Sequence, residues 1–139
     1  MSAVNQDSKK ALHLKRQPMT LKNIVASFSN LGVKERRSLT NDYIELVFYN
    51  EEMEKWNKII MDFFGCALKP GGINPTTEDL RLTKDFGGIC KNQVLFKKDI
   101  DNHTAIAMFW PWQDAAHTTL KMAVWENNSL VKRMHRWLT

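Results

Sequence analysis

Apolar and polar residues alternate in three successive runs between residues 93 and 125, and turn-forming residues separate the runs. The runs 93–98, 104–110 and 118–125 predict three antiparallel strands, because a strand places every second side chain on the same face. A fourth apolar run, 43–49, is rich in aromatic and β-branched residues and favours another strand, although so short a run also fits a buried helix. The pattern predicts an antiparallel sheet of three to four strands built around the meander 93–125.

Helical spacing replaces alternation in two longer segments. Apolar residues recur every three to four positions over 21–31, and Gly32 fits the position that follows a helix. A single apolar stripe runs along 51–64, where Asn50 can cap the start and Gly65 ends the pattern. We expect two amphipathic helices here, each burying its stripe against the sheet.

Two shorter helices and one loop complete the expected elements. Capping residues and acidic side chains predict a short helix near 77–85, and Ser129 can cap a basic amphipathic helix over 129–138. The apolar side of that last helix comprises Leu130, Val131, Met134, Trp137 and Leu138. About ten residues form a marginal helix in isolation, so we expect this helix to pack on the domain or on a neighbouring subunit. The polar segment 34–41 is expected to be a loop or a short helical turn.

These elements predict an α+β fold with helices packed mainly on one face of the sheet. Residues 19–139 are expected to form a single domain, and residues 1–18, which lack a sustained apolar pattern, a flexible basic N-terminal arm. If the even-numbered positions of the meander share the buried face, Phe96 pairs with Ile106 and Trp110 points into the core.

The formal net charge of +5 is unevenly distributed. Residues 1–37 carry eight Lys or Arg against two acidic residues, whereas residues 38–128 sum to −4. A basic end on a mildly acidic body suits an anionic partner such as nucleic acid or a lipid surface, or contact with the body of this or another copy. The candidate anion-contacting residues of the arm are Lys9, Lys10, Lys15 and Arg16.

The aromatic cluster at 109–112 is the best candidate for a binding site. Trp110 and Trp112 precede Asp114 and His117 at the edge of the predicted sheet. An exposed indole beside polar groups suits stacking on a base, a sugar or an aromatic side chain of a partner. The alternative interpretation is that Trp110 and one neighbour simply cover the core.

Motifs for catalysis, metals or cofactors are weak in this sequence. His103 and His117 fall at opposite ends of predicted strands, so they do not converge on a metal, and we expect no metal site and no cofactor. The Gly-Gly pairs at 71–72 and 87–88 complete no phosphate-binding loop. Cys66 and Cys90 form no CxxC motif and are expected to be reduced, partly buried thiols of a cytoplasmic protein.

The sequence alone favours a small cytoplasmic binding or interaction module. We expect it to self-associate as a homo-oligomer through the sheet face and the aromatic hairpin 110–117. One alternative is a nucleic-acid-associated protein that uses the basic arm, and another is a small-molecule enzyme with a pocket near Asp114 and His117. No apolar run approaches the roughly 18 residues of a transmembrane segment, so none is expected.

Overall fold

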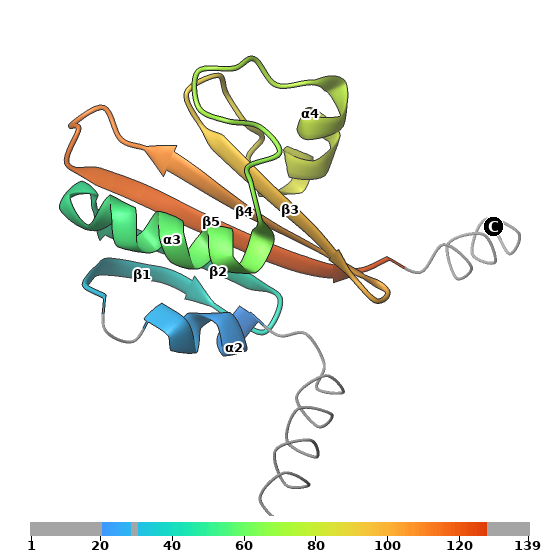
Figure 1. Ribbon diagram of the computed structural model, residues 1–139, viewed down its shortest axis with the longest axis horizontal. Coiled ribbons are helices and arrows are strands. Elements are labelled where there is room, and N and C mark those ends of the chain that lie inside the picture. The colour runs from blue at the N-terminus through green and yellow to red at the C-terminus, as the bar shows by residue number, and fades with distance from the viewer. Residues whose placement is uncertain (1–20, 29–30, 128–139) are drawn as a thin grey trace, which may run out of the picture.

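The structure is a computed structural model that describes residues 21–28 and 31–127. Figure 1 shows a twisted sheet with helices packed against it. The elements in chain order are α2 (Leu21–Val25), the 3-10 turn η1 (Ala26–Phe28), β1 (Val33–Leu39), β2 (Tyr43–Tyr49), η2 (Asn50–Glu52), α3 (Met53–Phe64), α4 (Thr77–Thr83), η3 (Lys84–Phe86), β3 (Val94–Ile100), β4 (His103–Pro111) and β5 (His117–Glu126). The arm expected over 1–18 and the helix expected over 129–138 lie outside the described residues.

All described strands form one antiparallel sheet in the order β1-β2-β5-β4-β3. The α+β class is confirmed, but the sheet has five strands rather than three to four. The additional strand is β1, and the expectation of a loop or helical turn over 34–41 is wrong. This edge strand carries four consecutive charged residues and two register shifts against β2, so apolar alternation is lost. Charges and bulges are common on edge strands because they discourage pairing with another chain.

The register of the meander differs by one residue from the prediction. Phe96 pairs with Ala107 instead of Ile106, and the β4–β5 pairing is shifted in the same sense. The cause is a tight β3–β4 turn of only two residues, Asp101 and Asn102, in which Asp101 adopts a positive φ of 53°. A shift of one residue exchanges the two faces of the partner strand. The even-numbered residues of the three strands therefore do not share one face.

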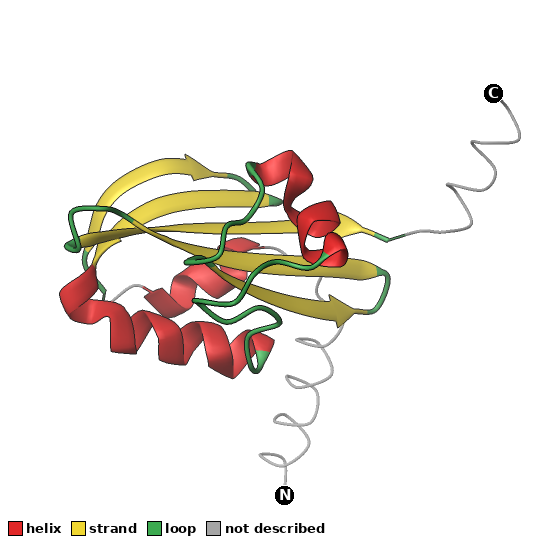
Figure 2. Cartoon of the chain, turned by 90° about the horizontal axis from the view of Figure 1, so that it is seen from above, coloured by secondary structure: helices red, strands yellow, loops and turns green. Residues whose placement is uncertain are grey.

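The sheet separates two apolar clusters. Helices lie on both of its faces (Figure 2). Helices α2 and α3 cover the inner face, where Trp56 stacks on Phe48 with ring centroids 4.7 Å apart. The α4–η3 segment covers part of the outer face, where Leu82 and Ile89 pack against Leu95, Ile106, Met108 and Ala123. Helices therefore lie on both faces, and the prediction that they pack mainly on one face holds only for α2 and α3.

Helix boundaries agree with the sequence at α3 and differ at α2. Helix α3 ends where predicted, and Gly65 follows it with a positive φ of 83°. Asn50 is not its cap: the Asn50 side-chain oxygen instead accepts a hydrogen bond of 2.6 Å from the Thr118 hydroxyl of β5. The helix expected over 21–31 is α-helical only over Leu21–Val25 and continues as the 3-10 turn η1, where the Phe28 ring lies 4.7 Å from that of Trp56.

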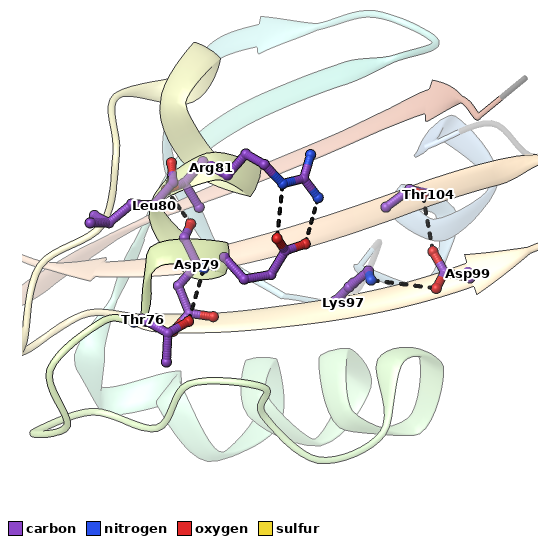
Figure 3. Close-up of polar contacts among 9 residues, drawn as sticks. Thr76, Asp79, Leu80, Arg81, Lys97, Asp99 and Thr104 are labelled. Atoms are coloured by element: carbon purple, nitrogen blue, oxygen red, sulfur yellow. Dashed lines mark hydrogen bonds and ion pairs between the residues drawn. The ribbon is translucent and has the colours of Figure 1, made fainter. Parts of the chain in front are cut away.

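The segment between α3 and β3 is held on the outer face by two polar arrangements. Thr76 and Asp79 form a reciprocal capping box at the start of α4, which confirms the short helix expected near 77–85 (Figure 3). Lys69 pairs its backbone with Leu95 of β3. Its buried ammonium group donates hydrogen bonds of 2.9, 2.9 and 2.6 Å to the carbonyl oxygens of Pro70, Lys91 and Gln93. These contacts fix the loop over the β3 edge of the sheet.

Candidate functional site

The outer sheet face is divided into a covered part and an open part. Trp110 belongs to the covered part, because the Trp110 ring packs against Gly87 at the end of η3. The Lys121 ammonium lies 3.4 Å from the centre of the same ring and donates a hydrogen bond of 3.0 Å to the Phe86 carbonyl. The indole nitrogen of Trp110 is buried without a hydrogen-bond partner among the described residues. Trp110 is therefore a packing residue.

Asp114 organises the turn that joins β4 and β5. Its Oδ1 accepts hydrogen bonds from the backbone N–H groups of Ala116 and His117 at 2.9 and 3.1 Å. Its Oδ2 lies 2.5 Å from His117 Nδ1. The side-chain hydrogen bond to His117, followed by the bond from Ala116, lowers the pKa of the Asp114 carboxyl below its ordinary value. Ala115 completes the turn with a positive φ of 58°.

Three aromatic rings meet beside this turn. The His117 ring lies 5.0 Å from the Trp112 ring and 5.3 Å from the Tyr49 ring of β2. The Trp112 indole donates a hydrogen bond of 2.8 Å to the Thr119 hydroxyl, which fixes the indole over β5. The Trp112 side chain as a whole is half-buried. Trp112 is therefore anchored at its nitrogen, and part of its ring is open to solvent.

Two cations of β1 lie over the Trp112 ring. The Lys34 ammonium is 4.9 Å from the ring centre and the Arg37 guanidinium carbon 5.6 Å. Arg37 also contacts Glu35 at 3.4 Å and Glu45 of β2 at 3.5 Å. The hydrogen bond with Glu35 is the largest effect that raises the pKa of Arg37 above its ordinary value. These side chains are solvent-accessible, so they can exchange their present contacts for contacts with a ligand.

We use the name Trp112 surface for the six residues Lys34, Arg37, Tyr49, Trp112, Asp114 and His117. Three of the four predicted site residues in the hairpin belong to it, whereas Trp110 packs under Gly87. Sequence reasoning missed Lys34, Arg37 and Tyr49, since they reach the hairpin only through the pairing of β1 with β2 and of β2 with β5. The predicted anion-contacting residues Lys9, Lys10, Lys15 and Arg16 lie outside the described residues.

The other chemical candidates are dispersed over the fold. His103 pairs with Glu126 and His117 with Tyr49, which puts the two histidines at opposite ends of β5. No group of three or more metal-ligating side chains occurs within 21–28 and 31–127. Cys66 and Cys90 are both exposed, so the expectation of partly buried thiols is wrong.

Two hollows of the molecule lie away from the Trp112 surface. One holds about 30 Å³ between η1 and strands β1 and β2, and the other about 400 Å³ between α2–η1 and α3. Neither is lined by Asp114 or His117, so neither supports the enzyme pocket expected near these two residues.

Comparison with protein-family models, with curated proteins and with solved structures finds no match for this chain. Among the described residues, no helix has the length and apolar character needed to span a membrane.

Proposed function

We propose that this chain is a small cytoplasmic module that binds single-stranded nucleic acid through the Trp112 surface. The observation that carries the proposal is the position of Lys34 and Arg37 over the Trp112 ring, 4.9 and 5.6 Å from its centre. Basic side chains interleaved with aromatic rings are typical of nucleic-acid interfaces. The basic N-terminal quarter is far from the aromatic hairpin in the sequence. In the fold, two of its basic residues, Lys34 and Arg37, lie on Trp112 of this hairpin.

The chemistry of the Trp112 surface matches both parts of a nucleotide. Lys34 and Arg37 supply the positive charge that phosphate groups require, and Arg37 adds a planar group suited to bidentate contact. Tyr49 is 39% exposed and lies 5.3 Å from His117, so its ring is available for stacking with a base. A duplex hides its base faces in the helical stack. A single strand offers phosphates and bases at the same time, and we therefore favour a single strand as the ligand.

Salt-dependent binding tests the phosphate contacts. The full chain is titrated into a fluorescein-labelled oligothymidylate of about 12 nucleotides, within the roughly 4–16 nucleotides that single-strand-binding domains cover, and anisotropy is recorded at several salt concentrations. Lys34→Gln with Arg37→Gln should reduce the slope of log K against log salt by about 1.4, at about 0.7 per lost phosphate contact. The control variant is Lys55→Gln with Lys58→Gln on α3, on the inner side of the sheet. It removes the same charge and should leave the slope nearly unchanged.

Stacking is tested by a second matched pair. Tyr49→Ala should weaken binding by about 5- to 150-fold, the equivalent of about 1–3 kcal/mol per stacked base. Met61→Ala on α3 is the control, since Met61 is also 39% exposed and lies on the other side of the molecule. Absence of binding at low salt, equal binding to a duplex of the same length, or equal losses in variant and control would contradict the proposal.

The basic arm is a candidate for further phosphate contacts. Replacing Lys9, Lys10, Lys15 and Arg16 by Gln in the full chain should lower the salt slope by up to about 2.8 if each cation contacts one phosphate. An unchanged slope would limit the interface to the Trp112 surface.

Self-association stays a prediction from the sequence. The edge strands disfavour pairing between sheets, because β1 carries charges and bulges and Leu95 of β3 already pairs with Lys69. A homo-oligomer would therefore have to use a face of the molecule rather than these edges. Light scattering on the free chain and on its complex with the oligonucleotide gives the number of copies in each.

A further inference from the structure

A groove lies between α2–η1 and α3, away from the Trp112 surface. It holds about 400 Å³ and is lined by Ile24, Ser27, Ile59, Asp62 and Phe63. The floor of this groove is apolar, and Ser27 and Asp62 form an exposed polar rim. An apolar groove with a polar rim suits an amphipathic helix, which places its apolar stripe inside and its charges at the edge.

We infer that residues 129–138 of the same chain form a helix that docks in this groove. Their sequence has the required pattern, with the apolar stripe Leu130, Val131, Met134, Trp137 and Leu138 and a polar side that carries Lys132, Arg133 and Arg136. The stripe contains a Trp and a Met, which fill an irregular apolar hollow well. About ten residues do not hold a helix alone, so this segment requires a surface.

The path of the chain supports this occupant. Asn127, the last described residue, donates its backbone N–H to the Asn102 carbonyl in the β3–β4 turn. Phe63 of the groove contacts the same hairpin, because Lys98 of β3, three residues before this turn, donates a hydrogen bond of 2.8 Å to the Phe63 carbonyl. In both views the end of β5 and the C-terminal end of α3 lie toward the same end of the sheet (Figures 1 and 2). The chain therefore leaves the sheet at the end toward which α3 runs.

Length and charge are also consistent with docking. Twelve residues follow Asn127 and can extend to about 40 Å, while a helix over 129–138 would be about 15 Å long. Helix α3, with 12 residues, is about 18 Å long, so the docked helix would fit alongside it. Asp62 is the acidic residue of the groove rim, and its exposed salt bridge to Lys58, 3.0 Å long, can be exchanged for one with 129–138, which carries three cations and no acidic residue. This complementarity favours a basic helix over an acidic or neutral one.

Methyl NMR of the full chain tests the inference. The δ1 methyl signals of Ile24 and Ile59 report on the groove, and those of Ile44 and Ile106 serve as internal references in the sheet. Trp137→Leu removes an aromatic ring from the segment while keeping it apolar. The ring current of a docked Trp137 would then disappear, so the Ile24 and Ile59 signals should shift while the reference signals stay in place.

Two further variants make the result unambiguous. Met134→Asp, in the apolar stripe, should move the two groove signals toward the positions they take when residues 128–139 are deleted. Lys132→Gln, on the side opposite the stripe, should leave them unchanged. Unmoved Ile24 and Ile59 signals in Trp137→Leu and Met134→Asp would overturn the inference. Groove signals that depend on protein concentration, with a doubled mass in light scattering, would also overturn it, because the occupant would then be a second copy.

Discussion

Gly87 is the residue at which the close packing under Trp110 can be measured. This glycine ends η3 with a positive φ of 100°. A Cβ atom added at this position would lie 2.6 Å from Cη2 of Trp110 and 3.1 Å from the Lys121 ammonium. Contacts below 3.0 Å are essentially never made by a real Cβ, so Gly87→Ala must displace the Trp110 ring, the η3 backbone or both.

The expected loss of stability has two parts. An L-residue in the left-handed region costs about 1–2 kcal/mol, of which about 0.4–1 kcal/mol returns because alanine restricts the unfolded chain. Inserting a methyl group into a closely packed contact costs a further ~1–3 kcal/mol. Gly87→Ala should therefore lower the free energy of unfolding by about 2–4 kcal/mol.

Gly88→Ala is the matched control. Gly88 also has a positive φ, of 79°, but an added Cβ would meet no atom within 4 Å. Its substitution should cost only the backbone part, about 1 kcal/mol. Urea unfolding followed by tryptophan fluorescence gives both values at equal denaturant slope. Equal destabilisation by the two variants would refute the claim that Trp110 is a packing residue held by Gly87.

Three other substitutions test the polar contacts of the fold. Lys69→Met removes the buried ammonium that the carbonyl groups of Pro70, Lys91 and Gln93 share, and it should cost about 2–4 kcal/mol in urea unfolding. Lys97→Met, at a half-buried lysine that contacts the Asp99 carboxylate, should cost under about 0.5 kcal/mol. Thr76→Ala removes the capping hydroxyl of α4 and should lower the free energy of unfolding by about 1 kcal/mol in the same assay. An unchanged free energy of unfolding would show that this cap does not stabilise the fold. Asp114→Asn keeps the acceptor for the turn but loses the charge. Because the folded pKa of Asp114 is lowered, its stabilisation is present above the unfolded pKa of about 3.9 and is lost as the pH falls through the folded pKa. Wild type should therefore have a higher free energy of unfolding than Asp114→Asn near pH 6, and the two values should converge in strong acid. A difference in free energy that does not change with pH would contradict a stabilising role for the Asp114 carboxylate.

The strands of the meander could be predicted from the sequence, but their register could not. Register is determined by alternation only where one face of a strand is apolar and the other polar. In β4 the six residues from Thr104 to Phe109 are all buried, because the inner helices cover one face and the α4–η3 segment covers the other. The apolar pattern of β4 therefore fits two registers that differ by one residue equally well. The two-residue β3–β4 turn decides between them.

The candidate site could be predicted only in part, because some of its residues are close in sequence and others come together through strand pairing. The hairpin supplied Trp112, Asp114 and His117 through local sequence, and Asp114 holds the turn by contacts within three residues. Lys34 and Arg37 could not be assigned to the site, because β1 has the charged, irregular sequence of a protected edge strand. Their position over Trp112 depends on pairings between β1, β2 and β5. The contact of Lys34 and Arg37 with Trp112 can therefore be seen only in the folded sheet.

The direction of β1 leads to a last prediction about the basic residues. Val33 pairs with Phe48 near the Trp112 surface, and Leu39 pairs with Ile44 at the other end of the strand, about 20 Å away. Leu21 donates a hydrogen bond to the Asn41 carbonyl at that far end, so residues 1–20 join the described chain there. Phosphates bound by the arm and by the Trp112 surface should then be different ones, and losses at separate sites add. The combined Gln variant of the arm and of β1 should show a loss in log K equal to the sum of the two separate losses. A combined loss clearly smaller than that sum, measured by the same anisotropy titration, would mean that the arm reaches the phosphates bound by β1.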